Sequence, residues 1–369
     1  MSRLFEPITI GNANLNHRVV MAPLTRFRTD DNNTPLPMVG EYYEQRASTP
    51  GTLLISEAIQ VSPAAGGMPY GPGIWSAAQI AAWKKVTDAV HAKGSYMFCQ
   101  LIALGRAADP ECLRETGNYD FCAPSPLPME AAGPDSAIPR ELREEEIQSI
   151  IGDFATAAKN AIAAGFDGVE AHGANGYLID QFLEDVTNQR TDRWGGSVEN
   201  RARFALGVAK AMVDAVGAER VAFRLSPWNT WQGMKMKDPV PQFSYVVEKL
   251  REMNLAYLHL TESRVVNSED VAKTEGIEFL LDIWGPEAPV IVAGGYNAEN
   301  TSQAVDIEYK KYNVAVAYGR HFIANPDLPF RLQKQLSLNK YQRATFYTPK
   351  VATGYVDYPF SPEFLAAKA

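Results

Sequence analysis

The chain has 369 residues, 46% of them hydrophobic, so it can bury a sizeable core as one large α/β domain or as two ordinary ones. Its formal net charge is -8, and it lacks a run of Lys and Arg that would bind nucleic acid or an anionic membrane surface. We therefore expect a small-molecule substrate and neither a nucleic-acid nor a membrane partner.

The cysteines Cys99, Cys112 and Cys122 are odd in number and show neither a CxxC pair nor a zinc-ligand spacing, which favours a reducing compartment. The N-terminal sequence MSRLFEPITIG reaches a proline and a glycine before any long apolar run, so we expect no signal peptide. No apolar stretch reaches the roughly 18 residues that a membrane span requires. These features predict a soluble, cytoplasmic protein, as a monomer or a homodimer.

Eight short apolar runs, rich in β-forming residues, are bounded by turn residues and mostly separated by helix-length segments. They cover residues 18–25, 52–60, 95–102, 168–173, 221–227, 256–262, 289–295 and 314–320. Helical patterns lie between them, for example at residues 77–93 and 147–164. Such alternation is typical of an α/β protein with a parallel sheet, and eight units predict a closed, eight-stranded (β/α) TIM barrel without exposed edges. We predict one domain over residues 1–369.

Two segments depart from this alternation. Residues 3–17, with Pro7 and a Gly11-Asn12 turn signal, predict an N-terminal hairpin that caps the bottom of the barrel. Residues 104–143 contain six prolines, too many for one helix, and predict an elaborated loop after the third strand. In barrels of this kind, loops at the carboxyl ends of the strands surround the active site.

The seventh and eighth runs end in glycines followed by an arginine. Gly294, Gly295 and Gly319 allow close backbone approach, and Arg320 can donate two parallel hydrogen bonds, which together suit a phosphate group. Alternatively, these glycines only turn the chain tightly and Arg320 pairs with a surface carboxylate. Spacing alone leaves both readings open.

The fourth run ends in an imidazole, a carboxamide and a phenol within six residues: His172, Asn175 and Tyr177. Two of these groups can donate hydrogen bonds to one carbonyl oxygen, and Tyr177 can supply a proton, since its reference pKa is near 10. The alternative is that His172 and Asn175 satisfy buried backbone groups while Tyr177 packs in the core. Arg224, within an apolar run, requires an anionic or strongly accepting partner.

The sequence lacks a Gly-x-Gly-x-x-Gly fingerprint, a Walker loop and a Gly-x-Ser-x-Gly elbow. If a nicotinamide cofactor is used, it is therefore not held in a separate dinucleotide domain. We expect it to dock transiently at the same site as the substrate.

Taken together, ten segments resemble the old yellow enzyme family of FMN-dependent ene-reductases. They are LFEP (4–7), MAPLTR (21–26), EYYEQR (41–46), PGIWS (72–76), HGANGYL (172–178), DRWGGS (192–197), ENR (199–201), YGR (318–320), FYTP (346–349) and GYVDYP (354–359). Residues 45–57 and 105–110 look most like fungal members associated with secondary metabolism.

The resemblance implies tightly bound, non-covalent FMN and NADPH as a transient reductant. It assigns ten residues to the flavin: Pro23, Thr25, Ala58, Gln100, His172, Arg224, Gly294, Gly295, Gly319 and Arg320. Among these, Thr25 would donate near flavin N5 and O4, and Gln100 and Arg224 would hold the pyrimidine end. The charge of Arg224 would favour the anion that develops at N1 and O2.

For the substrate, the resemblance implies that His172 and Asn175 bind the carbonyl, that Tyr177 protonates the adjacent carbon, and that Phe346 and Tyr347 wall the pocket. Two positions depart from the family's pattern. Ile102 stands in a stretch where many relatives carry an aromatic residue, and Met68 stands where several carry a tyrosine. Both changes predict a wider pocket and affect substrate identity rather than reaction class.

The implied activity is reduction of an alkene conjugated to a carbonyl, such as an enone or enal, with hydride passing from NADPH through flavin N5 and a proton coming from Tyr177. A flavin-dependent double-bond isomerase is the main alternative, although Tyr177 favours the reductase. A non-catalytic flavin- or ligand-binding barrel and a sugar-phosphate aldolase or isomerase are further alternatives. The intact set of site residues argues against a non-catalytic binding barrel. The lack of a suitable lysine at a strand end argues against an aldolase.

Overall fold

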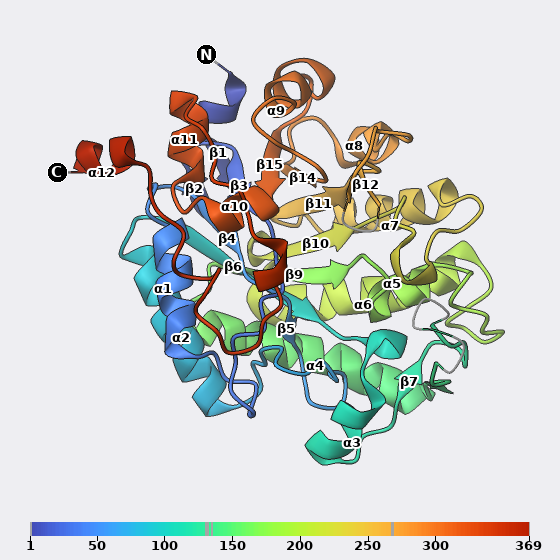
Figure 1. The fold of residues 1–369 in the computed structure, drawn as a ribbon. Helices are drawn as coiled ribbons and strands as arrows, with labels where there is room; N and C mark the ends of the chain where they lie inside the picture. The colour runs from blue at the N-terminus through green and yellow to red at the C-terminus, as the bar shows by residue number, and fades with distance from the viewer. Residues whose placement is uncertain (1, 130–132, 134–135, 267–268, 369) are drawn as a thin grey trace.

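The computed structural model describes residues 2–129, 133, 136–266 and 269–368. Its central element is a closed barrel of eight parallel strands surrounded by helices (Figure 1), as predicted. The barrel closes because β4 pairs with both β3 and β6, and β15 pairs with both β14 and β3. The strands are β3 (Val19–Met21), β4 (Leu53–Ile55), β6 (Tyr96–Ile102), β9 (Gly168–Gly173), β10 (Val221–Leu225), β11 (Tyr257–Thr261), β14 (Val290–Ala293) and β15 (Val314–Tyr318).

Helices follow the strands around the outside of the barrel. They are α1 (Pro37–Arg46), α2 (Ala77–His91), α4 (Glu144–Ala163), α6 (Val198–Val216), α7 (Val240–Glu252), α8 (Glu278–Trp284), α9 (Thr301–Gln303), α10 (Arg320–Ala324) and α11 (Leu328–Lys334). Helix α4 begins three residues before the predicted start, where three glutamates in its first turn are favourable to the helix dipole. None of the described helices combines the length and the apolar character needed to cross a membrane.

The first two barrel strands are shorter than predicted. Pro23 lacks the N–H that a continued ladder from β3 would need. After β4, the backbone N–H of Glu57 donates to the Tyr43 hydroxyl at 2.8 Å instead of to a neighbouring strand. Pairing resumes only in the two-residue strand β5 (Ile59–Gln60). The carboxyl ends of both strands thus leave the sheet and turn towards the rim of the barrel.

The predicted N-terminal hairpin is confirmed as β1 (Ile8–Ile10) paired antiparallel with β2 (Ala13–Leu15). Alternate side chains of both strands are buried. They form one apolar cluster with inward-facing barrel residues such as Leu53, Phe98 and Tyr257. The hairpin therefore seals the amino-terminal end of the barrel.

The interior of the barrel changes from apolar to polar along the strands. Phe98 and Ala222 belong to the apolar cluster over the hairpin, whereas the next inward positions on their strands are Gln100 and Arg224. Period-two alternation puts these pairs on the same face. The polar layer consequently lies towards the carboxyl ends, where the site was predicted.

The segment between β6 and α4 is an elaborated loop, as predicted. It contains a short helix, α3 (Pro110–Gly117), and two short paired strands, β7 (Cys122–Ala123) and β8 (Arg140–Glu141). Helix α3 begins at Pro110 with an Asp109 cap and ends at Asn118 in the left-handed conformation.

Residues 343–359, here called the C-terminal strap, are fastened by buried arginines. Arg26 donates to the carbonyls of Phe346 and Gly354 at 3.1 and 2.8 Å. Arg28 donates to the Val351 carbonyl at 3.0 Å, and the exposed surface of both arginines is nearly zero. The strap is therefore held through its backbone over the segment that follows β3.

Candidate active site

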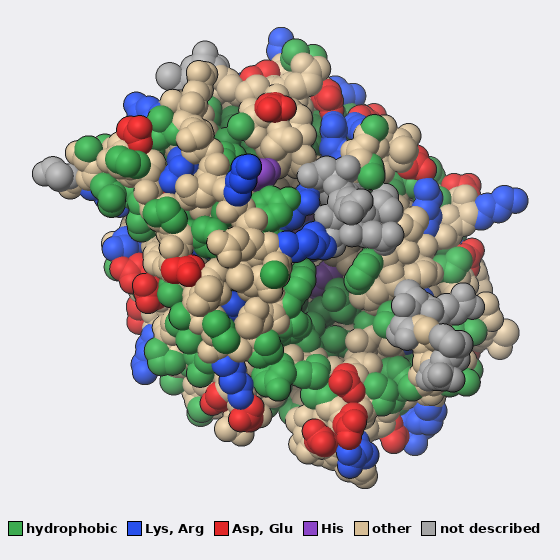
Figure 2. Space-filling model, viewed as in Figure 1, with side chains coloured by type: hydrophobic (Ala, Val, Ile, Leu, Met, Phe, Trp, Pro, Cys, Tyr) green, Lys and Arg blue, Asp and Glu red, His purple; other side chains and the backbone are tan. Residues whose placement is uncertain are grey.

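The face of the molecule shown in Figure 2 is hollowed near its centre. Figure 2 shows hydrophobic side chains gathered in this hollow, with a histidine side chain visible among them. The C-terminal strap crosses the same face (Figure 1). A hollow of this kind can enclose an apolar substrate and exclude water.

His172 and Tyr177 lie against each other at the carboxyl end of β9. Their ring centroids are 4.9 Å apart and the rings are nearly perpendicular. Burial, together with the charge of Arg224, lowers the pKa of His172 well below its usual value. Its Nδ1 accepts the Ala174 N–H at 3.3 Å, so the neutral ring carries its proton on Nε2, which is then a donor.

Asn175 lies in the loop after β9, between His172 and Tyr177 in the chain. Asn175 adopts a left-handed backbone conformation with φ 57°, and its N–H donates to the Ser226 hydroxyl at 2.8 Å. Burial raises the pKa of Tyr177, so the phenol keeps its proton at neutral pH. The three predicted residues thus provide donors and a proton within one short loop.

Three of the predicted flavin-edge and pocket residues share one apolar patch. Ala58, Met68 and Ile102 are buried in the same cluster, and the partly buried rings of Phe27 and Tyr177 pack against it. Ile102 and Met68 are aliphatic, so this wall offers contact area but no hydrogen bond of its own. An alkene held against Tyr177 would meet an apolar surface here.

A polar network lies one layer deeper in the barrel. Gln100 Nε2 donates to Glu170 Oε1 at 2.7 Å, and the other carboxylate oxygen of Glu170 is 2.8 Å from His259 Nδ1. Arg224, their neighbour on β10, is buried, and its Nε has no hydrogen-bond partner among the described residues. A buried guanidinium N–H without a partner is costly, so the site needs an acceptor at this point.

The glycines after β14 and β15 leave space for a close approach. Gly294 and Gly295 have positive φ angles of 127° and 62°. A side chain on Gly294 or Gly319 would stand 3.3 Å from the Glu262 carbonyl or from Leu24, respectively. Arg320 begins α10 and lies over the Tyr341 ring, 5.7 Å from its centroid. The rim here has the bare backbone and the positive charge expected of a phosphate site.

The orphaned Arg224 and the bare glycines are what FMN requires: an acceptor oxygen at the pyrimidine end and a phosphate at the other. Pro23 and Thr25, which follow β3, are both partly exposed rather than sealed in the core. The residues present therefore fit an FMN molecule lying across the carboxyl ends of the strands.

Phe346 and Tyr347 occupy different environments on the C-terminal strap. Phe346 is buried with Ile323 and Tyr358, and Leu24 packs against the same cluster. Tyr347 is 55% exposed and its ring centroid is 5.9 Å from that of Phe27. Tyr347 is thus the strap residue nearer the solvent at the mouth of the hollow.

Sequence reasoning missed Glu170, His259 and Gln232. A signal for Glu170 was present, because it lies two residues before His172 and therefore on the same face of β9. Gln232 has a positive φ of 63° and its carbonyl accepts from Arg106 at 2.6 Å, a contact between loops that spacing cannot reveal. With its amide oriented to satisfy hydrogen bonding, Gln232 donates to the Gly176 carbonyl at 3.2 Å, next to Tyr177.

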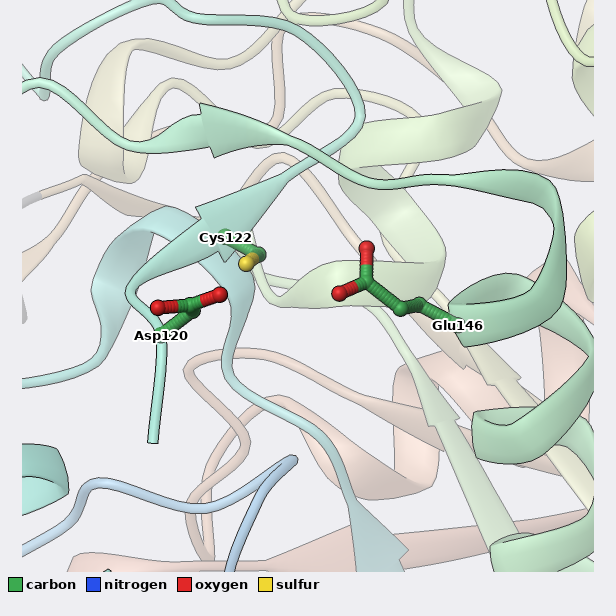
Figure 3. Close-up of side chains that lie close together, drawn as sticks. All are labelled: Asp120, Cys122 and Glu146. Atoms are coloured by element: carbon green, nitrogen blue, oxygen red, sulfur yellow. The ribbon is translucent and has the colours of Figure 1, made fainter. Parts of the chain in front are cut away.

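A second cluster of metal-ligand types, Asp120, Cys122 and Glu146, lies between the loop and α4 (Figure 3). Arg140 bonds to a carboxylate oxygen of Asp120 and of Glu146, each at 2.7 Å. Burial raises the pKa of the Cys122 thiol to about 11, which disfavours the thiolate that metals bind. The guanidinium of Arg140 thus already supplies the positive charge at this cluster.

Glu57, next to Ala58, provides a test of this rim through pH. Burial raises its pKa from 4.5 to about 7, so between these values the folded protein binds more protons than the unfolded chain. Its contribution to the free energy of unfolding therefore falls as pH rises through this window, by on the order of 3 kcal/mol.

Glu57→Gln should flatten this dependence, as measured by urea unfolding at pH 5 and pH 8. The exposed Glu41→Gln serves as control and should follow the wild type; a Glu57→Gln curve parallel to the wild type would contradict the prediction.

A fold and a site of this kind define the class of barrel flavoproteins that carry out redox chemistry on small molecules. Comparison with known proteins supports this assignment. Residues 3–339 match the NADH:flavin oxidoreductase / NADH oxidase family. The sequence is 38% identical to that of Old Yellow Enzyme from a Pichia species. The crystal structure of that protein matches this fold with a TM-score of 0.91, covering 98% of this chain and 94% of that one.

Three curated fungal proteins are about half identical to the chain. The chanoclavine-I aldehyde reductase fgaOx3 of Penicillium roqueforti is 55% identical over 100% of this chain and 99% of its own length. The NADP-dependent oxidoreductase lnbE of Aspergillus flavus is 52% identical over 98% and 97% of the two chains. A protein of Epichloe festucae var. lolii named "Probable inactive reductase easA" is 51% identical over 99% and 97%.

The chain belongs to the NADH:flavin oxidoreductase / NADH oxidase family, and within it to the old yellow enzymes. It is a flavin oxidoreductase, and its relatives include fungal proteins named as an aldehyde reductase and as an NADP-dependent oxidoreductase. Because relatives named as reductases and relatives named as probably inactive have similar overall identity to this chain, overall identity does not distinguish an active from an inactive protein, and the site residues carry that distinction.

Proposed function

We propose that the protein is an ene-reductase that binds FMN non-covalently and reduces alkenes conjugated to a carbonyl. Bound FMN would supply hydride transfer, taking hydride from NADPH and delivering it from N5 to the β-carbon of the alkene. The observation that carries the proposal is the neutral His172 ring beside the protonated Tyr177. A hydrogen-bonded carbonyl and a nearby acid are what polarised alkene reduction needs.

The protein's own groups divide the work. His172 Nε2 and the Asn175 amide would donate to the substrate carbonyl, drawing electron density away from the β-carbon. Tyr177 would then give its proton to the carbon next to the carbonyl, which commits the reaction to a saturated product. The apolar wall of Ala58, Met68 and Ile102 would exclude water from the reacting carbons.

An anaerobic visible spectrum of the purified protein tests the proposal. The flavin absorbance should bleach on adding NADPH and return on adding cyclohexenone, with cyclohexanone formed. A protein that takes up no FMN would overturn both cofactor and mechanism. Bleaching without return, together with a rearranged double bond, would replace the reductase by an isomerase.

A double substitution tests the carbonyl site. His172→Ala with Asn175→Ala should lower kcat/KM for cyclohexenone by about 10² to 10³, since both oxyanion-type donors are lost. FMN should remain bound, and phenol-type ligands should bind more weakly in a spectral titration. His91→Ala, exposed at the opposite end of the barrel, is the control. Unchanged enone kinetics in the double variant would remove both residues from the substrate site.

A further inference from the structure

The carboxylate of Glu170 is the centre of the deeper polar layer. The side chains of Glu170 and His259 have no exposed surface. One carboxylate oxygen accepts from Gln100 Nε2 at 2.7 Å, and the other lies 2.8 Å from His259 Nδ1. Burial lowers the pKa of His259, so at neutral pH the ring is uncharged and donates its Nδ1 proton to Glu170. The carboxylate therefore carries the negative charge of this layer.

Glu170 remains ionised despite its burial. Burial alone would raise its pKa, but His259, Arg224 and the Gln100 amide together hold the pKa below its usual value. Arg224 attracts the carboxylate, yet no hydrogen bond joins the two side chains, and Arg224 Nε stays without a partner among the described residues. Gln100 and His259 each bond to one carboxylate oxygen and so orient the carboxylate, and in this arrangement no hydrogen bond joins it to Arg224 among the described residues.

We propose that Glu170, held by His259, is a positioning residue for the flavin: it fixes the amide of Gln100 and partly offsets the charge of Arg224 without bonding to it. This inference rests on the proposed FMN site. A free Glu170–Arg224 ion pair would withdraw the guanidinium from the cofactor. With His259 in place, Arg224 keeps its N–H groups for the pyrimidine end.

The orientation of Gln100 follows from the same contact. Because its Nε2 is committed to Glu170, Gln100 presents Oε1 as an acceptor on its other side. The pyrimidine ring of a flavin carries one N–H donor, at N3, between two carbonyl oxygens. An amide fixed in this orientation recognises the N–H, whereas a freely rotating amide would offer N–H2 and oxygen alike.

Substitution of Glu170 by glutamine isolates the charge. In the variant, His259 can change tautomer so that its Nδ1 accepts from the new amide, and the hydrogen bonds between the two side chains and Gln100 can be kept. Reduction adds negative charge at the pyrimidine end, and this charge should be stabilised once the carboxylate charge is gone. We expect the ratio of the dissociation constants of oxidised and reduced FMN to rise at least tenfold, a positive shift of the two-electron midpoint potential of about 30 mV or more.

The potential separates positioning from a merely structural role. The loss of a structural contact would weaken oxidised and reduced FMN equally and leave the midpoint potential unchanged; that result would overturn the proposal. Glu184→Gln is the matched control, because Glu184 is as fully buried as Glu170 but accepts from the backbone N–H of Lys235 at 2.6 Å rather than from a residue of the polar layer. Its potential should match the wild type.

If Glu170→Gln gives no soluble protein, Glu170→Gln combined with His259→Gln makes the same charge change with two amides that can bond to each other, and the same positive shift is expected. The measurement uses the FMN-loaded protein and a reference dye and needs no alkene. A shifted potential with no enone reduction would therefore refute the proposed function alone. Enone reduction with an unshifted potential would refute only the role of Glu170.

Discussion

Replacing Tyr177 with phenylalanine should slow alkene reduction by about two to four orders of magnitude while FMN reduction by NADPH proceeds as in the wild type. The phenol lies beside His172 at the proposed carbonyl site, and burial keeps it protonated by raising its pKa. Its ring contacts His172, so phenylalanine preserves this packing and removes the hydroxyl group together with the proton that it carries. Stopped-flow absorbance can follow the two half-reactions separately.

Tyr347→Phe is the control for Tyr177, because it removes a phenol that is 55% exposed at the mouth of the same hollow. It should leave the oxidative half-reaction within about threefold of the wild type. If Tyr177→Phe reduces cyclohexenone as fast as the wild type, water or another residue supplies the proton. An isomerised alkene accumulating in that variant would show that Tyr177 commits the reaction to reduction.

Replacing Arg224 with methionine should raise the dissociation constant of FMN by a factor of about 30 or more. Truncating one partner of a buried charged contact costs about 2 to 5 kcal/mol, because the remaining groups are left unpaired. Arg224 is buried with an unpartnered Nε, so the cofactor is the acceptor that would be lost. Fluorescence titration of the apoprotein with FMN measures the change.

Arg220→Met, which alters a partly exposed arginine just before the same strand, provides the comparison. It should bind FMN like the wild type. Equal FMN affinity in the Arg224→Met protein would show that Arg224 is satisfied in some other way and would weaken the placement of the pyrimidine end.

The barrel could be predicted because its strands are local and repetitive, and each apolar run contains one of the eight barrel strands. The ends of the strands were predicted less well. Strand β4 does not continue to Glu57, because the backbone N–H of Glu57 donates to the hydroxyl of Tyr43 on another element. Arg224 was recognised because a charge within an apolar run has few partners. The N-terminal hairpin was found from its turn residues alone.

The Glu170–His259 pair was missed for a different reason. Both residues lie in the middle of a strand, whereas site residues were expected at strand ends. The pair also joins β9 to β11, at positions 89 residues apart that meet only when the barrel closes. The arginines that fasten the C-terminal strap act over still larger separations, up to 328 residues between Arg26 and Gly354. Contacts of this kind depend on closure of the whole fold, and spacing in the sequence carries no trace of them.

The hydrogen bonds from Arg26 and Arg28 hold the backbone of the C-terminal strap and do not depend on the strap side chains that line the hollow. Arg26 and Arg28 hold main-chain carbonyls, which every amino acid provides, so residues such as Tyr347 can be exchanged without loosening the segment. A barrel built in this manner can diversify its choice of substrate through a few side chains near the end of its chain, while the cofactor-binding strands stay unchanged. The strap can therefore be exchanged as a segment between relatives, and such chimeras are a direct route to altered substrate selectivity.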